Sequence, residues 1–110
     1  MHQDQGDSVE QAYDYLLRQP SPIVGGPLDA LQLMAELEVE TDELLTRAMS
    51  GEHVELDDIA GAERRRAFVW VHLAKDLPQF HTRARTAVEA WQRTEARIIT
   101  AVGAAARSGR

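Results

Sequence analysis

The side chains with the clearest chemical potential are two histidines and an aspartate in the second half of the chain. His72 and Asp76 are four residues apart, so they share one face if this segment is helical. A carboxylate can orient a histidine as a general base, and His81 follows shortly afterwards. The pair has no evident nucleophile, and neither a Gly-x-Ser-x-Gly motif nor a phosphate loop is present, so we assign no catalytic residue. Trp70, His72, Asp76 and His81 form a candidate ligand pocket, although the apolar run around His72 favours a hydrogen-bonded core histidine.

Metal binding is the second chemistry that these residues suggest. His72, Asp76 and His81 could donate to zinc, but Pro78 interrupts the segment between them. A carboxylate-bridged di-metal bundle would need Glu-x-x-His pairs, and the chain has none. The chain also has no cysteine, which excludes disulfides, thiolate metal ligands and cysteine nucleophiles. We therefore expect no metal site and no cofactor.

Charge divides the chain at three consecutive arginines, residues 64–66. Residues 1–63 contain fifteen acidic residues against two arginines, a balance of −13. Residues 64–110 contain ten basic residues against three acidic ones, a balance of +7. Such asymmetry is typical of acidic and basic interaction faces, or of two halves that neutralise each other within one fold. The candidate interaction residues are Glu36, Glu40, Glu43, Arg64, Arg65, Arg66, Arg93 and Arg97.

The arginines of residues 64–97 also allow an alternative function, that of a nucleic-acid-associated regulator. With Arg83 and Arg85, they could add up to a basic surface for phosphates. However, consecutive arginines on a helix point in different directions, and the acidic first half lowers the sequence pI to about 5.1. We therefore favour salt bridges from these arginines to acidic residues, within the fold or between copies.

Four helical segments must position these side chains: residues 8–18, 27–50, 57–75 and 78–106. In each, apolar residues recur three and four positions apart, which is the spacing of a helix with one buried face. Pro20 and Pro22 end the first segment, and Pro27 suits the first turn of the second. Gly51 supplies a left-handed cap, and Pro78 marks a restart. The sequence therefore predicts an all-α, four-helix bundle-like domain with one long acidic helix and a basic C-terminal helix.

The most continuously apolar stretch, residues 67–74, could pass for a buried strand. No turn residues bound it, however, and Ile59, Val69, Leu73 and Leu77 continue a helical spacing through it. We therefore predict a helix that is apolar on most sides and central to the bundle.

Length and composition indicate one domain over residues 8–106, with flexible tails at residues 1–7 and 107–110. Hydrophobic residues make up 44% and charged residues 27% of the 110 residues, which is typical of globular proteins. No apolar run is long enough to cross a membrane, and the first residues are polar and acidic rather than signal-like. We expect a cytoplasmic location and no membrane partner.

These features favour a non-enzymatic protein-interaction module, such as a small regulator, adaptor or chaperone-like helical protein, without excluding an enzyme. The long acidic helix and the final helix carry more apolar surface than a monomer of this size buries easily. We therefore expect a homo-oligomer or a protein partner, paired through complementary acidic and basic helix faces. A small ligand-binding or catalytic bundle centred on His72 is the third alternative.

Overall fold

The computed structural model describes residues 5–108, and these residues are almost entirely helical. The helices are α1 (Gln5–Arg18), α2 (Pro27–Met49), α3 (Leu56–Asp76) and α4 (His81–Ser108), with a short 3-10 helix, η1 (Pro78–Phe80), before α4. No strand occurs between residues 5 and 108, which confirms the all-α, four-helix prediction. The apolar run of residues 67–74 lies in the middle of α3 and is not a strand.

The outer ends of the first and last helices differ from the prediction. α1 begins at Gln5 rather than at residue 8, and α4 continues to Ser108 rather than ending at residue 106. Residues 5–7 and 107–108, which we assigned to flexible tails, therefore have helical backbone. No proline stands at either place, so nothing in the backbone prevents the helix from continuing. Residues 1–4 and 109–110, the remainder of the predicted tails, lie outside the described residues.

Local backbone chemistry fixes the ends of α2. Gly25 has a φ of 99°, and the Asp29 carboxylate accepts a hydrogen bond from the Gly26 N–H at 3.2 Å. Pro27 occupies the first turn, where no N–H is needed. After the helix, Gly51 adopts a φ of 88°, the left-handed conformation that was predicted for it.

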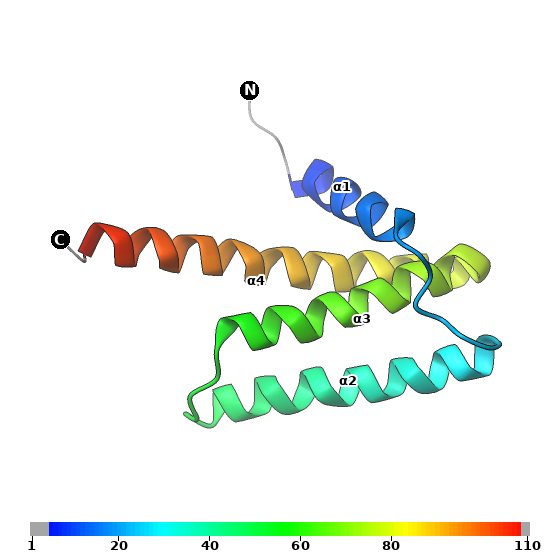
Figure 1. Ribbon diagram of the computed structural model, residues 1–110, viewed down its shortest axis with the longest axis horizontal. Helices are drawn as coiled ribbons and strands as arrows, with labels where there is room; N and C mark the ends of the chain where they lie inside the picture. Colours follow the sequence, from blue (N-terminus) through cyan, green and yellow to red (C-terminus); the bar gives the residue numbers. More distant parts are fainter. Residues whose placement is uncertain (1–4, 109–110) are drawn as a thin grey trace.

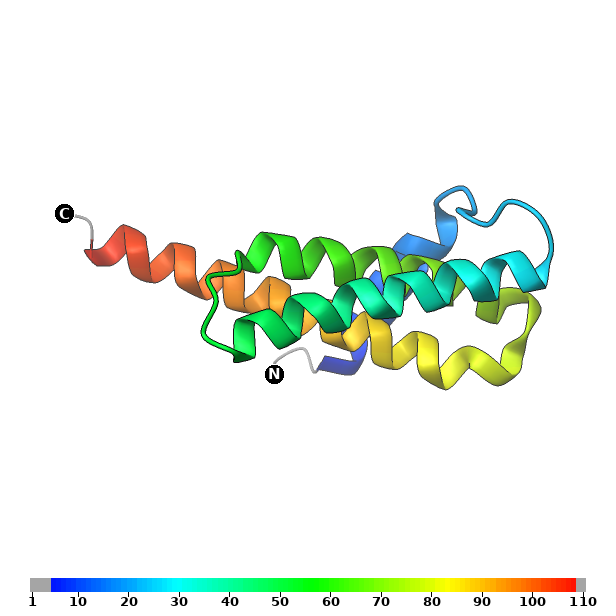
Figure 2. The same ribbon diagram turned by 90° about the horizontal axis from the view of Figure 1, so that it is seen from below.

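α3 is the central helix, as predicted, because it contacts α1, α2 and α4. Figure 1 shows α2 and α4 on different sides of α3, and α1 crossing the α3–α4 pair obliquely. Among the described helices, α2 contacts α3 alone. The end of α4 reaches beyond the other helices in both views (Figure 1 and Figure 2), and the structure measures 53 × 40 × 21 Å. α2 is therefore the helix with the largest share of its surface open.

The core lies around α3, between α1 and α4. Its largest fully buried apolar side chains are Leu16 of α1, Val71 of α3 and Val88 of α4. Each contributes about 1.5–3 kcal/mol through the removal of apolar surface from water. Trp70 and Trp91 are also buried, one on each side of the contact between α3 and α4. Of the helices in residues 5–108, none is both long enough and apolar enough to cross a membrane.

Candidate functional site

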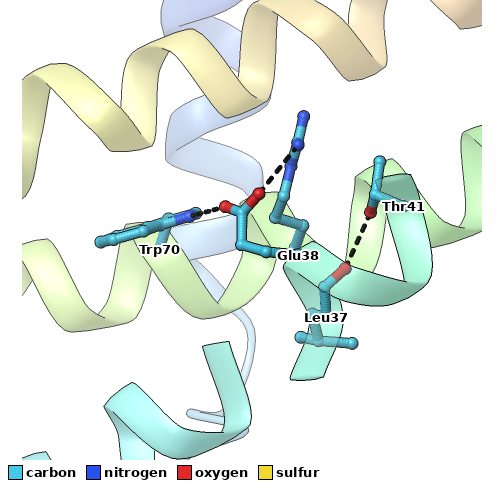
Figure 3. A network of polar contacts seen from close by, with 5 residues as sticks. Leu37, Glu38, Thr41 and Trp70 are labelled. Atoms are coloured by element: carbon cyan, nitrogen blue, oxygen red, sulfur yellow. Dashed lines mark hydrogen bonds and ion pairs between the residues drawn. The ribbon is translucent and has the colours of Figure 1, made fainter. Parts of the chain in front are cut away.

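Glu38 of α2 joins α2 to α3 through both of its carboxylate oxygens. Trp70 donates its indole N–H to Glu38 Oε2 at 3.0 Å, and Arg66 Nη1 donates to Oε1 at 3.3 Å (Figure 3). One turn further along α2, the buried Thr41 hydroxyl donates to the Leu37 carbonyl at 2.9 Å and so needs no partner on α3. Glu38 is therefore a single acceptor for two side chains of the central helix.

The three consecutive arginines lie in three different environments. Arg65 Nη2 donates to Glu40 Oε2 of α2 at 2.9 Å, next to the Arg66–Glu38 pair. Arg64 faces the other way, and its guanidinium carbon lies 5.8 Å from the ring centroid of Trp91 on α4. Two of the arginines thus neutralise the acidic residues of α2 within the fold. They do not form one continuous basic surface.

The remaining predicted interaction residues carry no ion pair within residues 5–108. Glu36 and Glu43 are exposed on α2, and Arg93 and Arg97 are exposed on α4. Arg83 is also exposed, and its guanidinium carbon lies 5.6 Å from the Trp70 ring centroid. Acidic charge without an ion pair therefore remains on α2, and basic charge without an ion pair remains on α4.

An apolar stripe follows the exposed side of α2, with Leu45 at its edge toward α3 and α4. We call it the outer stripe of α2. Val39 is 56% exposed and Met49 is 88% exposed, values that are high for side chains of this size. Its members recur at helical spacing, so they share one side of the helix. They are Leu28, Leu31, Val39, Leu45 and Met49.

Two cavities lie along α3 between α2 and α4, and together they define the α2–α4 cleft. The first has a volume of 210 Å³ and is lined by Glu38, Arg66, Trp70, Thr82, Arg83, Thr86 and Ala87. The second has a volume of 140 Å³ and is lined by Leu45, Leu56, Ile59, Glu63, Ala90, Arg93, Thr94 and Arg97. Both are bordered by α2, α3 and α4, so the cleft is a feature of the three long helices.

Glu63, which lines the second cavity, was not among the residues predicted from the sequence. Its side chain is buried, at 6% exposure, and Oε1 has no hydrogen bond. It also forms no ion pair with any described residue. A buried carboxylate without a donor is costly, so such groups are candidates for function. The available signal was its position four residues after Ile59 and seven before Trp70, on the buried side of α3.

The candidate ligand pocket centred on His72 is not brought together in the structure. His72 Nε2 donates to the Leu16 carbonyl of α1 at 2.9 Å, and the side chain is buried against Phe68. Trp70, two residues earlier on the same helix, points to the other side of α3, toward Glu38. His72 is therefore a hydrogen-bonded core histidine that joins α1 to α3, which is the alternative that the apolar run favoured.

Asp76 and His81 lie apart from this core contact. Asp76 is exposed at the last residue of α3, and His81 is exposed at the first residue of α4. The His81 ring lies 5.3 Å from the ring of Tyr13 on α1. Within the described part of the chain, no group of three or more His, Asp or Glu side chains is placed to hold a metal ion.

Tyr13 of α1 is a buried side chain whose pKa is shifted by its surroundings. Burial raises its pKa from the ordinary value of 10.0, the nearby Arg85 guanidinium lowers it, and the Glu10 carboxylate raises it further. Arg85 and Glu10 form an ion pair across the α1–α4 contact. Arg85, one of the arginines considered for phosphate binding, is therefore also neutralised within the fold.

Comparison with protein-family models, with characterised proteins and with solved structures finds no match to this chain. The function must therefore be argued from its own residues.

Proposed function

We propose that this chain is a self-associating protein-interaction module whose partner is a second copy of itself. The outer stripe of α2 and its flanking acidic residues pack against α2 and the α4 arginines of the other copy. The single observation that carries the proposal is that α2, among the helices of residues 5–108, contacts α3 alone and leaves its outer stripe exposed beside charges that form no ion pair.

Apolar burial supplies the driving force for this association. Each Leu, Val or Met side chain that is transferred from water contributes about 1.5–3 kcal/mol when it is fully buried. A twofold dimer brings two outer stripes together, because the same patch faces itself across the symmetry axis. The remaining exposed surface of these two stripes, when buried, offsets part or all of an association cost of about 4–15 kcal/mol.

Charge sets which surfaces meet. Glu36 and Glu43 flank the outer stripe, while Arg83 and Arg93 of α4 line the cleft and form no ion pair among the described residues. When α2 of one copy lies over the cleft of the other, each acidic face meets a basic one. Complementary charges of this kind fix orientation and exclude wrong partners more than they add affinity.

The internal ion pairs favour this proposal over a nucleic-acid-associated regulator. Arg65, Arg66 and Arg85 are bound to glutamates of the same chain, so their charge is already balanced. Hydrophobic contact between helices requires no disulfide, which suits a cysteine-free chain and the expected cytoplasmic location. The proposed role is non-enzymatic.

Light scattering coupled to size-exclusion chromatography tests the proposal directly. The wild-type chain is expected to elute as a dimer that dissociates on dilution. Val39→Glu places a charge in the middle of the outer stripe and should give a monomer with unchanged helicity. Tyr15→Glu is the matched control, because Tyr15 is similarly exposed, at 48% against 56% for Val39, but lies on α1.

A strict monomer at every concentration would contradict the proposal. So would a Val39→Glu variant that remains a dimer, or a Tyr15→Glu variant that becomes a monomer to the same extent.

A further inference from the structure

The last turns of α4 are apolar and reach beyond the other helices (Figure 1 and Figure 2). Residues 98–106 contain no charged side chain. Ile99 is 70% exposed and Val102 is 63% exposed, although both are large apolar side chains. Most of the stability of a helix in a protein comes from packing against another element, so a projecting apolar end is typical of a surface that a partner covers.

Two grooves lie beside this end of α4. The first has a volume of 450 Å³ and is bordered by α1 and α4, and Val9 and Ile99 are among its lining residues. The second has a volume of 290 Å³ and is bordered by α4 and by residues 53–57 at the start of α3, and Leu56 and Val102 are among its lining residues. Each groove therefore places free space next to one of the two exposed apolar side chains.

We propose that the end of α4 packs antiparallel against the end of α4 of another copy. Ile99 and Val102 are three residues apart, so they share one side of the helix. A twofold axis that crosses α4 midway between them pairs Ile99 of each copy with Val102 of the other. Val102 of one copy then enters the first groove of the other copy, and Ile99 enters the second, as knobs enter holes in a coiled coil.

The charge pattern favours a second copy over an unrelated partner. Residues 98–106 carry no charge, so the partner surface must also be uncharged, because a buried charge without a counter-charge is costly. The α4 end of another copy meets this requirement. In the antiparallel alignment residue 107, an arginine of α4, comes level with residue 94 of the other copy, next to Glu95. Glu95 forms no ion pair with any described residue, so opposite charges meet at each end of the contact.

This contact goes beyond the proposed α2 dimer and uses a different side of α4. Neither Ile99 nor Val102 lines a cavity of the α2–α4 cleft. Arg97, which lines the second cavity of that cleft, precedes Ile99 by two residues and so leaves α4 on nearly the opposite side. The α4 contact is the weaker of the two, because it buries two large apolar side chains per copy and the outer stripe of α2 has more. It therefore joins α2 dimers into larger species at higher concentration.

Sedimentation velocity over a concentration series tests the contact. The wild-type chain should associate in two steps, first to a dimer and then, at a concentration about tenfold higher or more, to larger species. Val102→Glu should keep the first step and lose the second. Thr100→Glu is the matched control, because it adds the same charge at an exposed position about 130° around α4 from the contact side, and it should keep both steps. Association that Val102→Glu leaves unchanged at every concentration, or that Thr100→Glu weakens equally, would overturn the inference.

The Val39→Glu variant separates this inference from the proposed function. It removes the α2 contact, so it should be a monomer throughout the first step of the wild type and should form a dimer only in the range of the second. Val39→Glu combined with Val102→Glu should be a monomer in both ranges. If the α2 contact does not form, a single step remains, which Val102→Glu should abolish and Val39→Glu should not. Failure of either proposal can thus be told from failure of the other.

A pair of charge variants tests the antiparallel pairing itself, in the Val39→Glu background so that the α4 contact is measured alone. Ile99→Lys in one chain and Val102→Glu in another each place a charge in the contact, so each chain alone should be a monomer. In a mixture the introduced lysine and glutamate stand opposite each other, while the remaining Ile99 and Val102 pair as in the wild type. The mixture should therefore form a dimer. A mixture that stays monomeric would overturn the inference, because a parallel contact would set residue 99 against residue 99.

Discussion

Glu38→Ala should weaken the contact between α2 and α3 more than removal of an ordinary exposed glutamate would. Glu38 is the acceptor for the buried Trp70 indole N–H at 3.0 Å and for Arg66 at 3.3 Å. A hydrogen bond to a charged acceptor contributes about 1.5–3 kcal/mol. The Arg66 pair is partly screened, because the Glu38 side chain is 40% exposed, and adds about 0–1 kcal/mol. The expected loss in free energy of unfolding is therefore about 1.5–4 kcal/mol.

Glu38→Gln is the matched control. The amide oxygen can still accept from Trp70, but the charge that attracts Arg66 is gone, so a smaller loss of about 1 kcal/mol is expected. Thermal unfolding followed by far-UV circular dichroism measures both variants. For a domain of this size, about 1 kcal/mol corresponds to a shift of about 4 °C in Tm. All samples must share one concentration, since the proposed self-association would make Tm concentration-dependent.

A double-mutant cycle with Trp70→Phe completes this test. If the indole N–H donates to Glu38, the two substitutions should show a coupling energy of about 1 kcal/mol or more. A Glu38→Ala variant within about 0.5 kcal/mol of the wild type would refute the reasoning, since that is the range of an uninvolved surface residue. A coupling energy of zero would refute it as well.

Three further changes test the backbone, the core and the pH dependence. Gly25→Ala should lower the free energy of unfolding by about 1–3 kcal/mol, because Gly25 has a φ of 99° and the new Cβ would lie 2.2 Å from Asp29 Oδ2. Gly26→Ala, with open space around its Cβ, should lower it far less. Urea denaturation measures both variants. His72→Leu should cost about 0.5–1.5 kcal/mol in the same assay, because it removes one of the two donors to the Leu16 carbonyl and leaves only the Gln19 N–H. Because the folded-state pKa of Tyr13 is raised above 10.0, the neutral phenol contributes fully to the free energy of unfolding below pH 10.0. This contribution is lost as pH rises through the higher folded-state pKa, and Tyr13→Phe should remove this alkaline loss of stability.

The fold could be predicted because helix signals in this chain are local and repeated. α2 begins at Pro27 and ends just before Gly51, as the sequence predicts. The helical spacing of apolar residues also correctly predicts that α3 continues through residues 67–74. The helix ends at residues 5 and 108 could not be placed, because polar residues such as Gln5 permit a helix without requiring one.

The site was harder to predict because it depends on which helices become neighbours. The sequence indicated that arginines would pair with the acidic helix, and Arg65 and Arg66 do so. It could not show that Arg64 turns away to Trp91, because that depends on how α4 lies against α3. Glu63 was missed because its burial depends on how α2 and α4 lie against α3, and its spacing from Ile59 and Trp70 alone does not show that.

The central claim is that the acidic face of α2 pairs with the basic face of α4 in another copy, and a mixing experiment tests it most directly. Glu36→Arg with Glu43→Arg makes both faces basic, and Arg83→Glu with Arg93→Glu in a second chain makes both acidic. Each variant alone should self-associate about tenfold more weakly than the wild type, or worse. Reversing Asp14, an exposed acid on α1, should have no such effect.

An equimolar mixture of the two variants should restore association, because both α2–α4 contacts of the mixed dimer are then between opposite charges. Sedimentation velocity with one variant labelled by a fluorophore reports this mixed species alone. The account predicts a heterodimer at concentrations where each variant is a monomer. A mixture that stays monomeric while the wild type forms a dimer would contradict it.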